Sequence, residues 1–234
     1  MQYLALLLGP EPTSPPSPEA QAAEMTAYQN FHAKAGSAIR AGDALTPAAA
    51  GVRITGGPDA PTVTDGPFAE GAEVAGGYYV FEADNLDDAL ALAREIPAAK
   101  QGAIEVRPIY HTVNPDWSLS GGQWLALLLE PPGSTNTPGS PEWQAESARH
   151  VEFAAAAGDH IAGGAALNEP ATATTVRVRD GKVLLTDGPY PEGAEIATGF
   201  YVLSAGDRDE AVKLASMIPA TSVEVRQLMG ISGL

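Results

Sequence analysis

His150 is the residue of this chain best suited, by type and spacing, to acid–base chemistry. It lies in the middle of an expected helix, with Glu146 one turn before it and Glu142 earlier in the same helix. A histidine titrates near neutral pH, and a Glu–His pair four residues apart can bind a metal ion. The alternative is a partly exposed helix residue beside a charged neighbour. Because only one histidine is available there, the sequence predicts no metal site.

Two Asp-Gly-Pro segments each place a carboxylate at the end of an expected strand. Asp65 and Asp187 open these segments, and such a carboxylate can act as a base or bind a ligand. Alternatively each aspartate caps its own turn, because Asp at the first turn position accepts backbone N–H groups. We expect the candidate catalytic residues to be Asp187, His150 and Asp65, with Asp187 as the shared carboxylate nearest to His150.

Glutamates follow both Asp-Gly-Pro segments, with Glu70 and Glu73 after the first and Glu192 and Glu195 after the second. Paired carboxylates can do acid–base work if burial separates their pKa values. The alternative is a solvated acidic loop on an acidic protein. Glu73 and Glu195 are therefore candidate ligand-binding residues.

Two arginines complete the set of candidate ligand-binding residues. Arg107 and Arg226 each follow a valine in the last expected strand of their half. An arginine near a barrel interior can bind a carboxylate with two parallel hydrogen bonds. The alternative is a structural ion pair with an acid of the loop after Asp-Gly-Pro.

The chain is one unit written twice. The run LALLL occurs at 4–8 and again at 125–129, and segment 65–80 matches segment 187–202 at eleven of 16 positions. Two copies of this length predict two domains rather than a solenoid. We expect domains at 1–110 and 122–234, joined by a linker at 111–121.

Each copy is expected to have the order β-α-β-β-β-α-β. In the second copy the helix starts after the Ser140 cap and stops at Gly158, and Asp180-Gly181 signals a tight hairpin. Its expected strands are 124–129, 174–179, 182–186, 198–203 and 222–228, and its second helix is 207–217. This order predicts an α+β fold with a ferredoxin-like core, in which both helices lie on one face of an antiparallel sheet.

The strand at 125–129 and the aromatic strand at 78–81 are apolar at both parities. Strands of this kind are covered on both faces. We therefore expect the two sheets to pack together as an intramolecular pseudo-dimer forming an α+β barrel. Tyr78, Tyr79, Phe200 and Tyr201 are interpreted as core residues.

The histidines make the two copies unequal. His150 aligns with Tyr28, and His32 aligns with Ala154, so no histidine is shared. This pattern excludes a two-site histidine mechanism and leaves one site in one copy. We expect that site at a barrel end, where the Asp-Gly-Pro loop meets the first helix.

Composition narrows the function classes. A net charge of −16, from 29 acidic and 13 basic residues, disfavours nucleic-acid or membrane partners. No cysteine is present, which excludes disulfides and thiolate chemistry. The apolar run near the N-terminus is too short for a signal peptide, so a cytoplasmic protein is expected. Phosphate-loop, dinucleotide, zinc-protease and hydrolase motifs are missing, and no cofactor is predicted.

Several segments together carry a resemblance to a known family. The Asp-Gly-Pro-Phe and Asp-Gly-Pro-Tyr motifs, the aromatic segments 76–79 and 198–201, and the Glu-Val-Arg endings at 105–107 and 224–226 resemble the DGPF-domain family of the YCII-related superfamily. The resemblance covers both copies and implies a dimeric α+β barrel, here made by one chain. Distant relatives carry a first-helix histidine of a His–Asp pair. That position falls near Met25 and Ser147, so this chemistry does not carry over.

Two functions follow from these observations. The first is a small-molecule-binding protein or cofactor-independent enzyme of the dimeric α+β barrel type. The second is a non-catalytic interaction or regulatory module that uses the barrel as a scaffold. A buried polar cluster in a pocket favours the first. A solid interior with a bare apolar surface patch favours the second. Beyond the intrachain pair, a monomer or weak homo-oligomer is expected.

Overall fold

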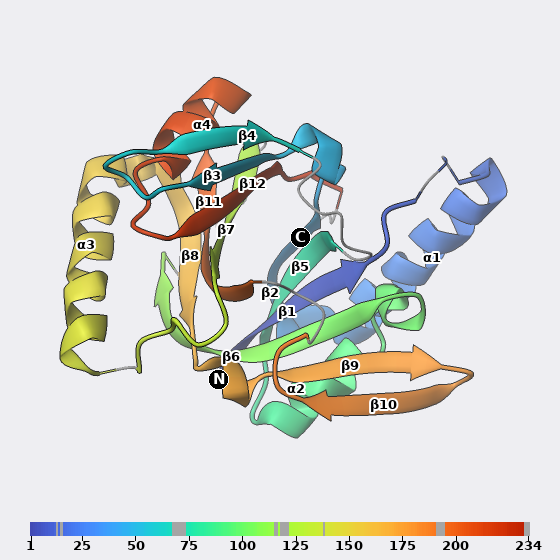
Figure 1. Cartoon of the computed structure of the whole chain (residues 1–234). Helices are drawn as coiled ribbons and strands as arrows, with labels where there is room; N and C mark the ends of the chain where they lie inside the picture. The colour runs from blue at the N-terminus through green and yellow to red at the C-terminus, as the bar shows by residue number, and fades with distance from the viewer. Residues whose placement is uncertain are drawn as a thin grey trace.

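The computed structural model describes residues 1–12, 14, 16–66, 74–114, 117, 122–137, 139–190 and 195–231. It shows a mixed α+β fold dominated by antiparallel sheet (Figure 1). The first half comprises β1 (Gln2–Gly9), α1 (Pro18–Ala35), β2 (Ile39–Ala44), β3 (Val52–Thr55), β4 (Thr62–Asp65), β5 (Val74–Glu82), α2 (Leu86–Ala93), η3 (Pro97–Lys100) and β6 (Ala103–Val113). The second half comprises β7 (Gln123–Glu130), α3 (Pro141–Ala157), β8 (Ile161–Leu167), β9 (Thr174–Arg179), β10 (Lys182–Asp187), β11 (Ile196–Ser204), α4 (Arg208–Ala215) and β12 (Ser222–Gln227). No helix among these residues combines the length and apolar character needed to cross a membrane.

The long helix of each half is delimited by the same residue types. The Ser17 and Ser140 side chains accept backbone N–H groups of the first turn of α1 and α3, and a proline follows each serine. Gly36 and Gly158 end the helices with positive φ angles of 52° and 54°. A serine cap supplies an acceptor for unpaired helix N–H groups, and glycine tolerates positive φ. The expected limits of α3 are confirmed.

The strand order repeats in the two halves. The first half runs β2-β5-β1-β6 and the second runs β8-β11-β7-β12. The sequence-based order lacked β2 and β8 and placed the hairpin strands in the core instead, and that assignment was wrong. The missed strands are rich in glycine and alanine, which are weak strand signals.

The two hairpins are exchanged between the halves. The β3–β4 hairpin of the first half pairs with β12, where Val52 lies opposite Val225. The β9–β10 hairpin of the second half pairs with β6, where Thr174 lies opposite Val106. Each half therefore completes the sheet of the other. Asp180 and Gly181 both have positive φ at the β9–β10 turn, as the sequence predicted for that hairpin.

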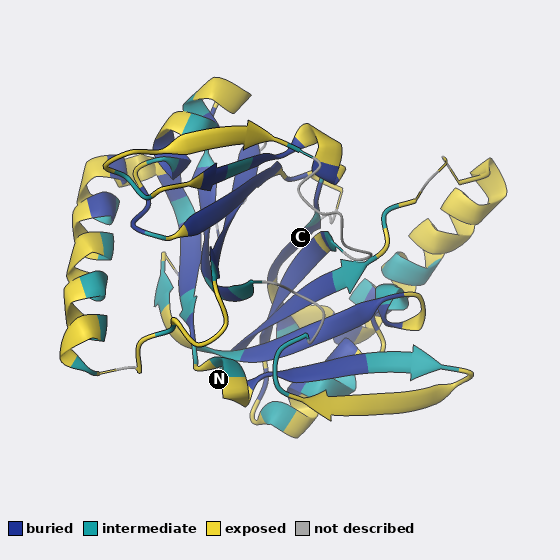
Figure 2. Ribbon diagram, viewed as in Figure 1, coloured by how far each residue is buried: buried dark blue, intermediate teal, exposed yellow. Residues whose placement is uncertain are grey.

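The sheet path returns to its start. The last residues of β6 pair with β8, from Ile109 opposite Leu167 to Val113 opposite Gly164, and a bridge joins Leu45 to Leu228. The strands around the enclosed space are largely buried (Figure 2). One buried cluster contains apolar residues of both halves, among them Leu4, Leu6, Tyr78, Val80, Trp117, Leu125, Leu127, Phe200 and Val202. The alternate residues of β1, such as Tyr3 and Ala5, pack in a separate cluster with α1 and α2, which we call the first-half helix-side core. The expectation that these strands are covered on both faces is confirmed.

Candidate functional site

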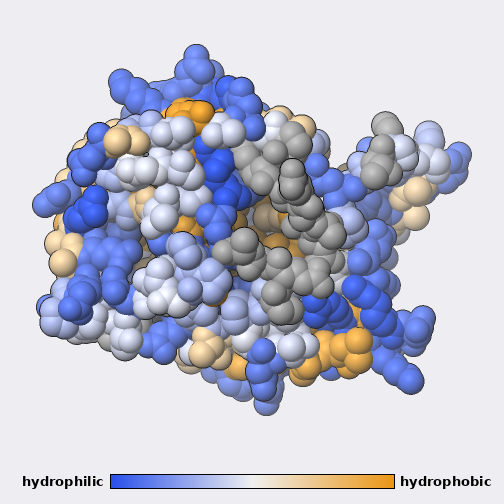
Figure 3. Space-filling view, in the orientation of Figure 1, coloured by the Kyte–Doolittle hydropathy of each residue, from blue (hydrophilic) through white to orange (hydrophobic). Residues whose placement is uncertain are grey.

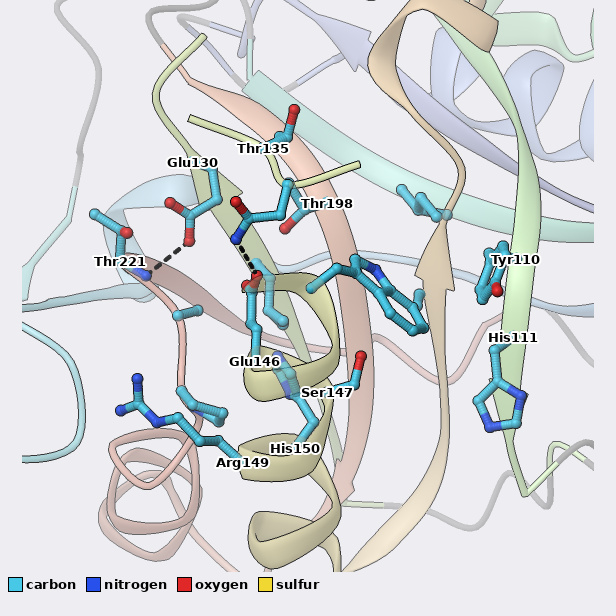
Figure 4. Close-up of a pocket in the computed structure, with 18 of the residues that line it drawn as sticks. Tyr110, His111, Glu130, Thr135, Glu146, Ser147, Arg149, His150, Thr198 and Thr221 are labelled. Atoms are coloured by element: carbon cyan, nitrogen blue, oxygen red, sulfur yellow. Dashed lines mark hydrogen bonds between the residues drawn. The ribbon is translucent and has the colours of Figure 1, made fainter. Parts of the chain in front are cut away.

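A cavity of about 1210 Å³ lies between α3 and the sheet of the second half, and we call it the α3 cleft (Figure 4). Strands β7, β11 and β8 supply one wall, the end of β6 lies at one side, and α3 supplies the opposite wall. Its lining includes Tyr110, Leu128, Glu130, Trp143, Glu146, His150, Ala166, Gly199, Tyr201 and Thr221. The lining therefore combines apolar and aromatic side chains with many polar and charged ones, among them Asp59, Glu142 and Arg149.

His150 forms the main polar contact of the α3 cleft. Its Nδ1 lies 3.0 Å from the hydroxyl of Tyr201. Burial and, to a smaller extent, the nearby charge of Arg149 lower the pKa of His150 to about 4, with Glu130 partly opposing both. Burial also raises the pKa of Tyr201 to about 12. Both groups are therefore uncharged near pH 7, and the imidazole has a second nitrogen that can donate or accept.

The position of Tyr201 depends on a glycine in the neighbouring strand. Tyr201 pairs with Gly164 across β11 and β8. A Cβ atom at Gly164 would lie 2.7 Å from Cδ1 of Tyr201, so the ring lies across bare backbone. Phe153 of α3 holds the other side of the ring at a centroid distance of 5.0 Å. The sequence analysis interpreted Tyr201 only as a core residue. Gly164, together with its counterpart Gly42 in the first copy, is the sequence signal that could have indicated its place in the site.

The first half contains a matching His–Tyr pair. The Nε2 atom of His32 lies 2.7 Å from the hydroxyl of Tyr79, and Tyr79 pairs with Gly42 as Tyr201 does with Gly164. His32 and His150 do not align in the repeat, but they are displaced by one helical turn and so share a helix face. Position in the alignment did not reveal this shared contact, and the expectation of one histidine site in one copy stays a prediction.

The first-half pair differs because Tyr28 occupies the position of His150. Tyr28 packs against the first-half helix-side core and makes a hydrogen bond with the Ala98 backbone. Burial raises its pKa to about 12. The counterpart of Ala98 in the second half is Ala220, which lines the α3 cleft. Tyr28 thus lies beside Ala98 in the first half, whereas Ala220 faces the α3 cleft in the second.

The exchange of hairpins is a second difference between the two halves. The β3–β4 loop reaches the α3 cleft with Gly56, Gly57, Pro58 and Asp59. The shorter β9–β10 hairpin instead brings Arg179 to the first half, where its guanidinium donates to the carbonyls of Ala99, Lys100 and Gly102 at distances of 2.8–3.0 Å. The longer loop extends a cavity wall, whereas the shorter hairpin caps a backbone turn.

The two ends of the α3 cleft have different chemistry. At one end Trp143 packs edge-on against Tyr110, with ring centroids 5.2 Å apart. At the other, Glu130 accepts from the Thr221 N–H at 2.9 Å and Glu146 accepts from Asn136 at 3.1 Å (Figure 4). A ligand with an aromatic body and a hydrogen-bonding group fits this lining better than an anion.

The candidate arginines are held in buried pairs. Arg107 is 1% exposed, bonds to Glu105 and donates to the carbonyl of Ala197 in the other half. Arg226 pairs with Glu224 at 3.0 Å and donates to the carbonyl of Thr46. The expected structural partner was an acid of the Asp-Gly-Pro loop. The structure shows instead the glutamate two residues earlier in the same strand.

The Glu-Val-Arg glutamates also anchor segments of the opposite half. Glu105 accepts from the backbone N–H of Tyr190 at 2.8 Å, and burial raises its pKa against the opposing charge of Arg107. Glu224 binds Arg53 at 3.0 Å. These contacts hold the exchanged hairpins in place.

The remaining candidates do not gather around His150. Asp187 ends β10 opposite Thr174 and is not among the described residues that line the α3 cleft. Asp65 ends β4, where it is exposed and pairs with Arg208. The hairpin exchange carries each aspartate onto the sheet of the other half, which separates Asp187 from His150. Tyr201 stands where the carboxylate was expected.

Of the glutamates that follow the Asp-Gly-Pro segments, only Glu195 is among the described residues. Glu195 pairs with Arg53, which gives it a structural partner. Glu73, like Glu70 and Glu192, lies outside the described residues. Among those that are described, no group of three or more His, Cys, Asp or Glu side chains is placed to hold a metal ion.

Comparison with known proteins identifies a family. The model of the YCII-related domain matches residues 1–113 and again residues 128–231. No curated protein matches the chain. Among solved structures, the chain is similar to a protein described as a "Putative Chlorite dismutase", with 7% sequence identity, a TM-score of 0.45, and coverage of 99% of this chain and 97% of that one.

Proposed function

The chain belongs to the YCII-related domain family, and on that premise we propose that it binds a small organic molecule in the α3 cleft. The observation that carries this proposal is the His150–Tyr201 pair, which faces a cavity of about 1210 Å³. Cavities of this order bury most of the surface of a small ligand.

We also propose the architecture that makes this site. Residues 1–110 and 122–234 form two ferredoxin-like domains, joined by a linker at 111–121, and together they form an intramolecular pseudo-dimeric α+β barrel. The repeated strand order, the exchanged hairpins and the shared interior support this interpretation. One ligand site per chain is expected, because Tyr28 fills the corresponding space in the first half.

The proposed chemistry needs no cofactor. With a pKa of about 4, His150 is neutral near pH 7 and is a weak base. If the Tyr201 hydroxyl donates to Nδ1, the proton of the imidazole is on Nε2, where it can donate to a carbonyl or hydroxyl oxygen. A neutral histidine in this role polarises an oxygen rather than removing a proton. The aromatic end formed by Trp143 and Tyr110 contacts the apolar body of the ligand.

The second candidate function, an interaction module, has its own support. The barrel interior contains a large cluster of buried apolar side chains from both halves. One edge strand also exposes large apolar residues. The α3 cleft shares Ala165 and Leu167 with the interior cluster but opens towards α3, so the two functions do not exclude each other.

Matched tyrosine variants test the ligand site. An aromatic fragment library is screened against the protein by ligand-observed NMR, and hits are tested with Tyr201→Phe, His150→Ala and the first-half control Tyr79→Phe. We expect hits to lose about tenfold in affinity with Tyr201→Phe or His150→Ala. Tyr79→Phe should leave affinity unchanged. Equal effects of the two tyrosine variants, or hits that survive His150→Ala, would reject the α3 cleft as the site.

A further inference from the structure

Strand β10 is an apolar edge. It pairs only with β9 among the described strands, and all six of its residues are exposed. Val183, Leu184 and Leu185 are 42%, 49% and 55% exposed. Figure 3 shows a hydrophobic patch at the lower right of the molecule, where Figure 1 places β10. An exposed edge with free backbone groups and apolar side chains is a template for pairing with another strand.

The other free edge of the sheet is different. Strand β4 is also fully exposed, but its sequence is TVTD and its one large apolar residue is Val63, at 48% exposed. Asp65 at its end pairs with Arg208. Polar and charged residues protect an edge against pairing. In β10 the charged residues stand only at the two ends, Lys182 and Asp187, and the three residues after Lys182 are apolar.

The exposed face of β10 continues a buried one. Ile104 of β6 lies opposite Val176 of β9, and Val176 lies opposite Leu185 of β10. Ile104 and Val176 are fully buried in the first-half helix-side core, whereas Leu185 is 55% exposed. The row of apolar side chains therefore extends one strand further than the helices and loops that bury it. A further strand on this edge would extend the row and bury its last member.

The sequence of β10 matches a second copy of itself. We propose that two chains associate through β10, antiparallel about a two-fold axis, with Leu184 opposite the partner's Leu184. In this register Val183 lies opposite the partner's Leu185, and Lys182 lies opposite the partner's Thr186. All three apolar residues then meet apolar residues, and each face of the new pair is consistent with the alternation of side chains.

Other symmetric registers are worse. Moving the axis one residue towards the end of β10 sets Asp187 opposite the partner's Val183 and Thr186 opposite the partner's Leu184. Moving it one residue the other way sets Lys182 opposite the partner's Leu184. A half-step shift places side chains of opposite faces against each other, which a two-fold axis forbids. The Leu184-centred register is thus the one that this strand favours.

The surroundings of β10 oppose association less than the net charge suggests. The whole chain carries −16, but Arg177 lies opposite Leu184 on β9 and Lys182 begins β10. Arg177 also stacks on the ring of Tyr190, 4.9 Å from its centroid. These cations offset Asp180 and Asp187 at the ends of the strand. A second copy, with the same strand, therefore meets no uncompensated like charge along the pair.

Because the chain contains no cysteine, single-cysteine variants report the register directly. Under mild oxidation Leu184→Cys should form a covalent dimer, because the two sulfurs meet at the axis, within the reach of a disulfide. Val63→Cys on β4 is the matched control and should cross-link at least about tenfold more slowly. Equal cross-linking of the two variants would overturn the proposal.

Sedimentation velocity of the full-length chain over a range of concentrations supplies the second readout. We expect a concentration-dependent dimer whose association constant falls about tenfold or more with Leu184→Lys, because a buried leucine is lost. The control Val63→Lys should leave the constant unchanged. A chain that stays monomeric up to millimolar concentration, or a dimer insensitive to Leu184→Lys, would overturn the proposal, and the edge would then belong to a different protein partner.

Discussion

The two halves of this molecule share a scaffold and differ in one space. Each has a histidine on its long helix bonded to a tyrosine that lies across a strand glycine. In the first half Tyr28 packs beside that pair, and in the second half the corresponding space is the α3 cleft. In our proposal the first copy keeps a closed, structural version of the arrangement, while the second leaves space for a ligand. Duplication within one chain permits this, because the two copies can differ where two identical chains cannot.

The strongest way to break this comparison is to separate the halves. Residues 1–112 expressed alone lack the β9–β10 hairpin that completes the first-half sheet and the residues that cover the inner face of β1 and β5. Roughly several hundred Å² of apolar surface would be exposed, at about 25 cal/mol per Å². Size-exclusion chromatography with light scattering should show a homodimer or aggregate. A stable, folded monomer would contradict the shared interior.

The strand glycines give the next largest effect. In Gly164→Ala the new Cβ would lie 2.7 Å from the Tyr201 ring, and in Gly42→Ala it would lie 2.3 Å from the Tyr79 ring. Each substitution should lower the free energy of unfolding by about 1–3 kcal/mol, measured by urea denaturation. Only Gly164→Ala should also weaken ligand binding. Binding lost in both variants would indicate that the halves are coupled more tightly than proposed.

The pH dependence of stability tests whether His150, which stands where the first half has Tyr28, is buried in its neutral form. Burial lowers the pKa of His150 from 6.5 in the unfolded chain to about 4 in the folded one. The unfolded state therefore binds more protons between these values, so stability falls as pH drops from about 6.5 to 4.

We expect His150→Asn to flatten that slope, removing about 1–3 kcal/mol of pH-dependent stability. Urea denaturation of both proteins at several pH values measures it. Identical slopes for wild type and His150→Asn would show that the imidazole is not buried in a neutral form.

The smallest expected effect concerns the hydrogen bond itself. Tyr201→Phe and Tyr79→Phe each remove one hydroxyl from a His–Tyr pair. Both should lower the free energy of unfolding by about 1 kcal/mol, because one neutral hydrogen bond is lost. Thermal denaturation of the two variants checks the similarity. A large difference between them would mean that only one pair is part of the scaffold.

Local signals in the sequence were sufficient for much of the fold. Ser140 and Gly158 delimit α3 as predicted, and Asp180-Gly181 makes the expected hairpin. The strands β2 and β8 were missed because short runs of glycine and alanine lack the side chains that usually identify a strand. At Gly42 and Gly164 in those strands a Cβ atom would collide with the Tyr79 or Tyr201 ring, so the rings require glycine there.

The site was harder to predict because it depends on register between distant segments. His150 was a candidate from its helix position, but its partner Tyr201 follows from the pairing of β11 with β8. The expected partner, Asp187, is on the other side of the hairpin exchange. Nothing local in a hairpin specifies which of two similar sheets it extends.

Exchanging the two helix residues tests the central claim most directly. His150→Tyr should narrow the part of the α3 cleft beside Ala220, as Tyr28 packs beside Ala98 in the first half, and Tyr28→His should relieve that packing. Calorimetric titration with the tightest fragment found by NMR should give one site per wild-type chain. Binding should be abolished by His150→Tyr and remain at one or more sites in Tyr28→His. Two sites per wild-type chain, or unchanged binding in a folded His150→Tyr variant, would contradict a single ligand site in the second half.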